Sequence, residues 1–441
     1  MTQCVGENVL TVAPIARASG QISLPGSKSI SNRALLLAAL CSETTCLKGL
    51  LKAEDTERML EALQRLGADV KQRGGDFFIT PGSEFPLREA ELFVGNAGTV
   101  SRMLTAFLAF AGGTYVLDGV KRMRERPIAD LVDALRAVGA KIEYRGTPGC
   151  LPLCIFPSQI QSDTTRVRGS VSSQFLTALL LASVGWARRL HRAFHIEIVG
   201  KLISRPYVEM TVSMMRSFGA DVQETSDGYI VGTRTMSSPG TYTVEGDASG
   251  ASYFLALGAL AGGPVRVTGL GRHSLQGDVH FADVLARMGA DVVFADDFIE
   301  VSRKPGTPLR GLTVDCLSIP DAAMTFVPMA LCTQGAMELT GIASWRVKET
   351  DRLDAMVREI SKFGACVLSG PDWIRVERGP RISSARVATY SDHRMAMSFA
   401  LAACAGVSVQ IENPACTAKT FPEFFKAFFT LIGQDSARLQ G

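Results

Sequence analysis

The segment MLEALQRLGADVK, residues 59–71, contains a pattern from which the architecture of the chain can be predicted. Its apolar residues recur every three or four positions, which is typical of a helix with one buried face. Gly67 follows the last of them, at the position where a glycine often ends a helix. The alternation in Asp69-Val70-Lys71 then predicts a strand. A helix, a glycine turn and a strand therefore form one structural unit.

The same unit recurs along the chain of 441 residues. Each glycine follows an apolar residue and lies 69 to 80 residues from the next copy. Six units of about 73 residues therefore fill the chain, which predicts a repeated α/β architecture. The six copies are Leu66-Gly67-Ala68, Val138-Gly139-Ala140, Phe218-Gly219-Ala220, Met288-Gly289-Ala290, Phe363-Gly364-Ala365 and the weaker Ile432-Gly433.

A second periodic feature is a set of six strongly apolar helical runs. Helices that are apolar on every side must lie at the centre of their domains. Polar clusters precede the runs, and several contain Lys or Arg, although a cation at a helix start opposes the helix dipole. We therefore favour anion binding over simple helix capping for these clusters. The runs begin near Ala34, Met103, Phe175, Phe254, Phe326 and Met395, and the cations are Lys28, Arg33, Arg102 and Arg394.

Composition limits the partners and the compartment. The 46 basic and 43 acidic side chains leave a net charge of +3, too small a bias to predict binding to nucleic acid or to a membrane surface. The cysteines form no Cys-x-x-Cys pair, and residues 1–20 lack a secretory or transit signal, so we expect a reduced, cytosolic protein. The uncharged stretches 169–187 and 248–265 predict buried helices. His191 and His195 do not share a helix face, so we predict no metal site there.

Two charged segments can be explained by exposure to solvent. Lys121 to Pro127 contains four cations, and an exposed turn is the usual explanation for such a run. Arg346 to Arg352 alternates charge, so a solvated helix start and a functional role carry equal weight. The segment Gly26-Ser27-Lys28-Ser29 departs from the phosphate-binding loop of nucleotide hydrolases because a serine separates the glycine from the lysine.

Four segments together resemble the signatures of the 5-enolpyruvylshikimate-3-phosphate synthase family. The resemblance runs from about Ser23 to Phe425. It implies a two-domain inside-out α/β barrel with three repeat units in each domain. Domain 1 would hold residues 1–25 and 247–441, and domain 2 residues 26–246. The four segments are LPGSKSISNR (residues 24–33), GNAGT (95–99), RVKETDR (346–352) and DHR (392–394).

The resemblance also implies a reaction. The enolpyruvyl group of phosphoenolpyruvate would pass to the 5-hydroxyl of shikimate 3-phosphate, with release of phosphate and no metal or organic cofactor, in a monomer that glyphosate inhibits. Glu349 would give the proton to C3, and Asp321 or Lys28 would take the hydroxyl proton. The shikimate 3-phosphate residues would be Ser29, Arg33, Ser172, Ser173, Gln174, Ser204, Asp321 and Lys348. The phosphoenolpyruvate residues would be Lys28, Gly98, Arg126, Gln174, Arg352, Arg394 and Lys419.

The sequence departs from the family pattern at several positions, none of which removes a charged residue of the implied site. The common form has Ala, Met and Pro at Val100, Ser101 and Met103, an Asn at Ser344 and an Arg at Ala418. Gly98 is kept and leaves room for a small inhibitor, so we expect sensitivity to glyphosate.

Three alternatives remain at this stage. The enolpyruvyl transferase that acts on UDP-N-acetylglucosamine shares the fold but carries a cysteine in the loop corresponding to residues 121–127, where this chain has none. RNA 3′-phosphate cyclase would need a nucleotide-linked histidine and a more basic surface. A repeat scaffold without enzymatic activity would use the polar helix starts as caps only.

Overall fold

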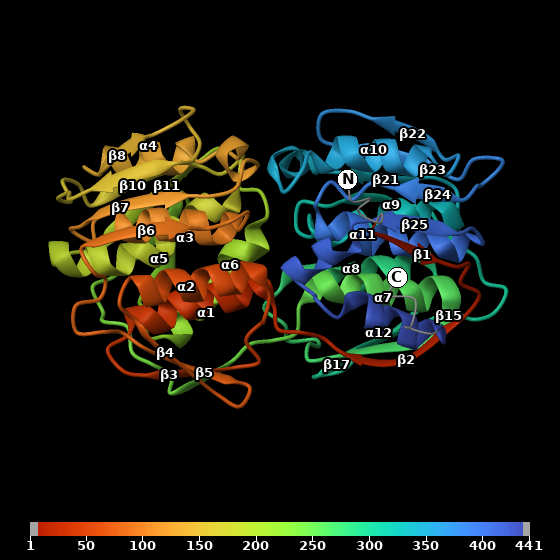
Figure 1. Ribbon diagram of the computed structural model, residues 1–441, viewed down its shortest axis with the longest axis horizontal. Coiled ribbons are helices and arrows are strands. Elements are labelled where there is room, and N and C mark those ends of the chain that lie inside the picture. Colours follow the sequence, from red (N-terminus) through yellow and green to blue (C-terminus); the bar gives the residue numbers. More distant parts are fainter. Residues whose placement is uncertain (1–7, 435–441) are drawn as a thin grey trace, which may run out of the picture. The chain divides into compact units, whose positions relative to one another are not determined.

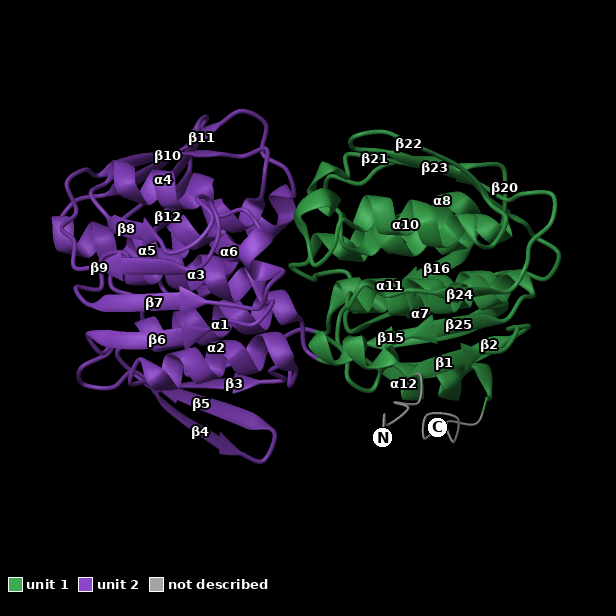
Figure 2. Cartoon of the chain, turned by 45° about the horizontal axis from the view of Figure 1, so that its top comes forward, with its two compact units in different colours: residues 1–25, 246–441 green, residues 26–245 purple. Residues whose placement is uncertain are grey.

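The computed structural model of the chain describes residues 8–434, and the chain divides into two compact units (Figures 1 and 2). Unit 1 comprises residues 1–25 and 246–441, and unit 2 comprises residues 26–245. Both units mix helices with small sheets, so the protein belongs to the mixed α/β class. The short 3-10 helices are labelled η below.

Unit 2 contains three four-stranded sheets that share one strand pattern. In each sheet two parallel strands lie side by side and two antiparallel strands follow. The repeated α/β unit predicted from the glycines is thus confirmed here. The strands are β3 (Thr45–Lys48), β4 (Asp69–Arg73), β5 (Asp76–Thr80), β6 (Glu89–Phe93), β7 (Thr114–Asp118), β8 (Lys141–Tyr144), β9 (Leu153–Phe156), β10 (Thr164–Arg168), β11 (Phe194–Val199), β12 (Val222–Glu224), β13 (Gly228–Val231) and β14 (Thr241–Thr243).

The helices of unit 2 connect the strands of two sheets in the same way. A buried helix joins the two parallel strands, as α3 joins β6 to β7 and α5 joins β10 to β11, and an amphipathic helix joins the second parallel strand to the antiparallel pair. Two parallel strands cannot be joined by a tight turn, so a helix serves as the crossover between them. In the third sheet α1 precedes β3, and the parallel partner β14 comes from the end of the unit. The helices are α1 (Lys28–Leu40), α2 (Glu54–Arg65), α3 (Gly98–Leu108), η1 (Met123–Glu125), α4 (Ala129–Ala137), α5 (Ser173–Leu190) and α6 (Arg205–Ser217).

Unit 1 repeats the same strand pattern in the orders β16-β17-β15-β2 and β19-β21-β23-β22, and in the shorter sheet β1-β25-β24. In the last sheet the strand from the N-terminal segment, β1, pairs antiparallel with β25. The strands are β1 (Val9–Val12), β2 (Ala18–Ser23), β15 (Gly262–Thr268), β16 (Asp291–Phe294), β17 (Phe298–Ser302), β18 (Leu309–Arg310), β19 (Thr313–Asp315), β20 (Thr333–Gln334), β21 (Met337–Thr340), β22 (Cys366–Ser369), β23 (Ile374–Glu377), β24 (Ala385–Val387) and β25 (Val409–Glu412).

The helices of unit 1 are less regular than those of unit 2. The fifth apolar run, expected as one helix, is broken into η3, α9 and η4, because Pro328 in its middle cannot donate a helical hydrogen bond. The helices are α7 (Ala248–Ala261), η2 (Gly277–His280), α8 (Phe281–Met288), η3 (Ala322–Thr325), α9 (Phe326–Met329), η4 (Ala330–Cys332), η5 (Ala343–Val347), α10 (Arg352–Ser361), α11 (His393–Ala400), η6 (Leu401–Ala405), η7 (Pro414–Lys419) and α12 (Phe424–Ile432).

The six glycines of the repeat confirm the predicted helix ends. All six have a positive φ, between 64° and 110°, a conformation in which a side chain is strained. At Gly139 an added Cβ would also come within 2.6 Å of the carbonyl oxygen of Gln159. The glycines are Gly67, Gly139, Gly219, Gly289, Gly364 and Gly433.

The chain passes between the units twice, at residues 25–26 and 245–246. Strand β2 pairs with β15 of unit 1 although it leads into α1, and β14 pairs with β3 of unit 2 although it leads into α7. Within unit 2 the Ser27 amide donates to the Glu245 carbonyl at 2.7 Å, and within unit 1 the Asp247 amide donates to the Pro25 carbonyl at 2.9 Å. The two connections therefore run side by side.

The expected buried helices are found in both units. The stretches 169–187 and 248–265 supply α5 and α7, and every residue of α7 is buried. Among residues 8–434 there is no helix whose length and hydropathy would suit a membrane span.

Candidate active site

The start of α1 presents the first predicted cation, Lys28. The Ser27 hydroxyl caps the helix by accepting from the Ile30 amide, and the Lys28 side chain is nearly buried. Lys28 Nζ lies 3.4 Å from Asp55 Oδ2, whose carboxylate is also buried at the start of α2. Asp55 therefore supplies part of the negative charge that was expected beside Lys28, and no motif in the sequence revealed this residue.

Arg33, one turn further along α1, is buried among neutral acceptors. Its Nε donates to Thr211 Oγ1 at 2.8 Å, and Nη2 donates to Thr177 Oγ1 at 3.3 Å. The other acceptors are the carbonyl oxygens of Ser29 and Tyr207. Among residues 8–434 no carboxylate pairs with this guanidinium, and burial lowers the pKa of Arg33 to about 10. Such a cation is well suited to receive an anion, because no described side chain neutralises its charge.

Gly98 begins α3 and lies directly against Arg126. A Cβ at residue 98 would come within 2.5 Å of Arg126 Nη2 and 2.8 Å of Arg102 Nη1. The absence of a side chain therefore lets the Arg126 guanidinium approach the helix start, where free amide groups favour an anion. Arg126 is buried, and Nη1 donates to the carbonyl oxygen of Asn96 at 3.0 Å and to its side-chain oxygen at 3.2 Å.

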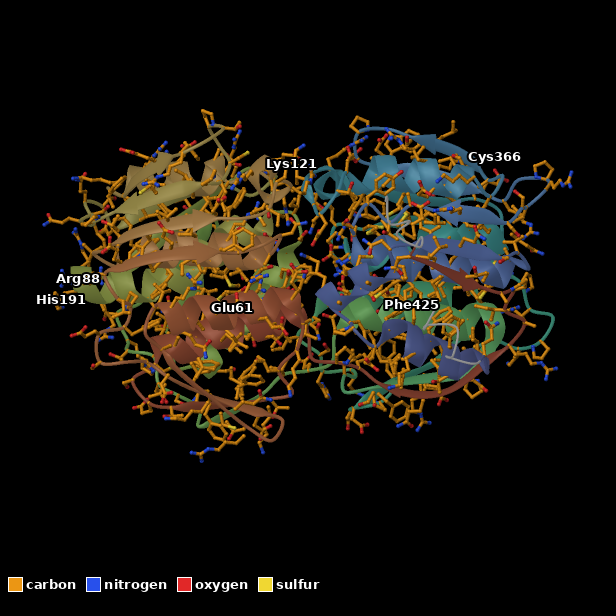
Figure 3. All side chains as sticks on the ribbon, viewed as in Figure 1. Glu61, Arg88, Lys121, His191, Cys366 and Phe425 are labelled. Carbon is orange, nitrogen blue, oxygen red and sulfur yellow. The ribbon has the colours of Figure 1, made fainter. Side chains whose placement is uncertain are left out.

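The segment Lys121–Pro127 is only partly the exposed turn that its charge suggested. Lys121, labelled in Figure 3, is exposed, whereas Arg126 is 3% exposed at the end of η1. The exposed-turn interpretation is therefore wrong for Arg126. Its Nε is buried and finds no acceptor among residues 8–434. The cation thus retains hydrogen-bonding capacity that the described chain does not use.

The predicted serines lie at the starts of α5 and α6. The Ser172 hydroxyl caps α5 by accepting from the Gln174 amide at 3.2 Å, and Ser173 is the first helical residue. Ser204 precedes α6 with a φ of 51°, an unusual conformation for a residue other than glycine. Because β10 and β11 are parallel, the segments that follow them emerge at one edge of the sheet, and the Ile203 amide donates to the Gly169 carbonyl at 3.0 Å. The hydroxyl groups of the two helix starts are thus brought into one region of unit 2.

Asp321 is the centre of the cluster in unit 1. Its Oδ1 lies 3.0 Å from Arg352 Nη1 and 3.3 Å from Lys348 Nζ, and its Oδ2 lies 3.1 Å from Arg394 Nη2. Three predicted cations therefore converge on one predicted carboxylate. Residues that are up to 73 positions apart in the sequence meet here.

Arg352 is held by three carboxylates. Besides Asp321, its Nη2 lies 3.0 Å from Glu349 Oε2, and its Nε lies 2.7 Å from Asp392 Oδ2. Burial by itself would lower the pKa of Arg352, but Asp392, Glu349 and Asp321 together outweigh it and raise the pKa above its usual value. Because the side chain is 1% exposed, the solvated-helix interpretation of the Arg346–Arg352 segment is wrong for this residue.

Arg394 and Lys419 complete the predicted cations of unit 1. Arg394 Nη1 donates to the Tyr253 hydroxyl at 3.3 Å, and Asp392 caps α11 by accepting from the Arg394 amide at 2.9 Å. Lys419 is buried at the end of η7, a segment that packs against α11. Asp392 belongs to a quoted motif, so its chemistry was visible, but its contact with Arg352 depends on a separation of 40 residues that no local pattern encodes.

Comparison with known proteins identifies the family to which this chain belongs. A family model described as EPSP synthase (3-phosphoshikimate 1-carboxyvinyltransferase) matches residues 12–428. Two 3-phosphoshikimate 1-carboxyvinyltransferases, from Cellvibrio japonicus and Laribacter hongkongensis, are 52% and 53% identical over 431 residues, which cover 96% of this chain and 99% of each relative.

Two solved structures are also similar. The EPSP synthase from Acinetobacter baumannii has a TM-score of 0.77 at 25% identity and covers 96% of this chain and 98% of its own. The enolpyruvyl transferase NikO from Streptomyces tendae has a TM-score of 0.75 at 19% identity, with 98% of each chain covered. The second likeness is one of fold alone.

Proposed function

Because the chain belongs to the EPSP synthase (3-phosphoshikimate 1-carboxyvinyltransferase) family, we propose that the side-chain clusters of its two units hold the two substrates of the family's reaction. The chain is an enolpyruvyl transferase of the shikimate pathway, which leads to the aromatic amino acids. It transfers the enolpyruvyl group of phosphoenolpyruvate to the 5-hydroxyl of shikimate 3-phosphate and releases phosphate.

We assign shikimate 3-phosphate mainly to unit 2. Within the described part of the chain, the buried Arg33 guanidinium donates to hydroxyl and carbonyl groups and to no carboxylate, so a phosphate or carboxylate would supply its counter-charge. The hydroxyls at the starts of α5 and α6 are donors of the kind that a phosphate accepts. The proposed residues are Ser29, Arg33, Ser172, Ser173, Gln174 and Ser204, with Asp321 and Lys348 from unit 1.

We assign phosphoenolpyruvate to cations of both units. This substrate places a phosphate and a carboxylate on a three-carbon molecule, and planar guanidinium groups match both of these anions. The contact between Gly98 and Arg126 supports one half of the site, and the group around Asp321 supports the other. The proposed residues are Lys28, Gly98, Arg126, Gln174, Arg352, Arg394 and Lys419.

The proposed chemistry is addition followed by elimination. The 5-hydroxyl loses its proton while its oxygen bonds to C2 of phosphoenolpyruvate, and C3 takes up a proton to give a tetrahedral intermediate. Loss of a C3 proton and of phosphate then restores the double bond. Glu349 is the proposed proton donor to C3, and Asp321 and Lys28 are the two candidates for the base.

The proposal has further parts that rest on the family resemblance. The two units would be the domains of an inside-out α/β barrel with a hinge at residues 25–26 and 245–246, and they would close on the substrates. The enzyme would act as a cytosolic monomer. Glyphosate would inhibit it, and full activity at millimolar glyphosate would contradict that part.

The observation that carries the assignment is the convergence of Lys348, Arg352 and Arg394 on Asp321. The test is release of phosphate from phosphoenolpyruvate, measured with and without shikimate 3-phosphate. Release should require both substrates, and Glu349→Ala should lower it by at least about a hundredfold, as loss of a general acid does. Glu338→Ala, which removes an ion-paired carboxylate from strand β21 of the same unit, is the matched control and should keep full activity. If the two variants behave alike, the assignment of Glu349 fails.

A further inference from the structure

Helix α10 carries two buried charged residues on one face. Arg352 is its first residue, and Glu359 follows seven positions later. Seven positions are close to two helical turns, so both side chains project from the same side of the helix. Both are 1% exposed. Arg352 belongs to the proposed substrate site, whereas Glu359 is not among the proposed substrate-binding or catalytic residues.

Glu359 holds the segment that precedes α11. Its Oε1 accepts from the Tyr390 hydroxyl at 2.8 Å, and its Oε2 accepts from the Ala388 amide at 2.9 Å. Lys362 Nζ lies 2.6 Å from the same Oε2 and supplies a counter-charge. One side chain of α10 thus binds both the backbone and a side chain of residues 388–390.

The segment held by Glu359 is strained. Tyr390 and Ser391 have φ values of 53° and 54°, in the left-handed region that residues with side chains rarely occupy. The Asp392 amide donates to the Thr389 carbonyl at 2.8 Å and closes the turn. Such a conformation persists only where the surroundings enforce it, and each such residue costs of the order of 1 kcal/mol or more.

The strained turn delivers Asp392 to its place. Asp392 Oδ2 accepts from Arg352 Nε at 2.7 Å, and Oδ1 accepts from the Arg394 amide at the start of α11. The segment 388–392 is therefore fastened to α10 at two points, by Glu359 at one end and by Arg352 at the other. The first fastening fixes where the second can form.

We propose that Glu359 is a positioning residue for the phosphoenolpyruvate site: it holds residues 388–391 in the left-handed turn that brings Asp392 to Arg352 and orients Arg394. This inference rests on the proposed function of Arg352 and Arg394. It adds a residue that touches no substrate and acts through the turn. Partial desolvation of the hydroxyl and its hydrogen bond to the Glu359 carboxylate also raise the pKa of Tyr390 to about 12, although the residue is exposed overall.

The test uses two variants of different severity. Glu359→Gln keeps the size of the side chain but leaves one acceptor atom where the turn and Lys362 use two, so kcat/KM for phosphoenolpyruvate should fall by about tenfold or more through misplacement of the guanidinium groups. Tyr390→Phe removes one hydroxyl only and should give a smaller loss in the same constant. Glu338→Gln, which neutralises a partly exposed carboxylate on β21 of the same unit, should leave the constant unchanged.

A rescue experiment separates positioning from stability. Glycine adopts the left-handed conformation without strain, so Ser391→Gly should remove part of the need for the Glu359 contacts. In the Glu359→Gln background, Ser391→Gly should raise kcat/KM by at least about threefold. A turn with less backbone strain is populated in a larger fraction of the molecules. A Glu359→Gln protein with an unchanged kcat/KM, or one whose loss Ser391→Gly does not reduce, would overturn the proposal.

Arg352→Lys distinguishes failure of this inference from failure of the proposed function. If Arg352→Lys leaves the KM for phosphoenolpyruvate unchanged, then the assignment of Arg352 to this substrate is wrong and the inference falls with it. If Arg352→Lys raises that KM while Glu359→Gln does not, then only the role of Glu359 is wrong.

Discussion

Arg33, inside α1 of unit 2, and Arg352, at the start of α10 of unit 1, are both buried, yet their surroundings are opposite. Arg33 has hydroxyl and carbonyl neighbours and a lowered pKa, whereas Arg352 has three carboxylates and a raised pKa. The first arrangement leaves a positive charge for a ligand to neutralise. The second holds a guanidinium in a fixed orientation before any ligand arrives. Burial alone therefore does not reveal the role of an arginine, whereas its hydrogen-bond and ion-pair partners do.

The largest effect should come from Arg352→Met. The buried carboxylates of Glu349 and Asp392 and the partly buried carboxylate of Asp321 would lose their shared cation, and breaking a buried ion-pair cluster costs about 3 to 5 kcal/mol of unfolding free energy. Urea unfolding followed by tryptophan fluorescence measures the loss. Arg375→Met is the control, because its partner Glu338 is partly exposed and such pairs contribute about 0 to 1 kcal/mol. Equal losses in the two variants would show that the carboxylates around Arg352 are not a cooperative cluster.

Arg33→Met should cost much less stability, which makes the contrast sharp. No carboxylate among the described residues is left without its cation, and the Thr211 hydroxyl also donates to the Tyr207 carbonyl. We expect a loss below about 1.5 kcal/mol in the same urea experiment, since an apolar residue of similar length replaces an unneutralised charge. A loss as large as that of Arg352→Met would contradict the difference between the two sites.

Gly98→Ala tests the close approach of Arg126 in unit 2. The new methyl group would come within 2.5 Å of Arg126 Nη2, so the guanidinium must move. Steady-state kinetics should show a rise of about tenfold in the KM for phosphoenolpyruvate, with the melting temperature little changed. Gly185→Ala is the control, because an added Cβ there meets no atom within 4 Å. An unchanged KM for phosphoenolpyruvate in Gly98→Ala would remove Arg126 from the proposed site.

The smallest expected effect is a dependence of stability on pH. Burial lowers the pKa of Arg33 to about 10, so near that pH the folded protein holds the proton less tightly than the unfolded chain does. Where the unfolded chain binds more protons, stability rises with pH. Between pH 8 and pH 10 the free energy of unfolding of the natural protein should therefore rise by roughly 0.4 kcal/mol relative to that of Arg33→Met. If the difference in unfolding free energy between the natural protein and Arg33→Met does not rise over this range, the pKa of Arg33 is not lowered.

The repeat was readable from the sequence because a local rule fixes it. Gly67 and its five counterparts need a left-handed conformation at the end of a helix, and few residues other than glycine supply it. The broken fifth helix was less visible, because the apolar pattern continues across Pro328 although the helical hydrogen bonds do not.

The partners of the site residues were harder to predict than the residues themselves. Lys28 and Arg352 were found through motifs, but Asp55 lies 27 positions after Lys28 and Asp392 lies 40 positions after Arg352. These contacts depend on how distant repeat units pack, which no local pattern records. For the same reason the neutral surroundings of Arg33, including Thr177 and Thr211, could not be foreseen.

The most direct test measures how substitution of each arginine changes the KM for each substrate. KM values for both substrates would be measured by phosphate release for Arg33→Met and for Arg352→Lys. We expect Arg33→Met to raise the KM for shikimate 3-phosphate more than the KM for phosphoenolpyruvate, and Arg352→Lys to do the reverse. Equal effects on both substrates, or the reverse assignment, would contradict this expectation.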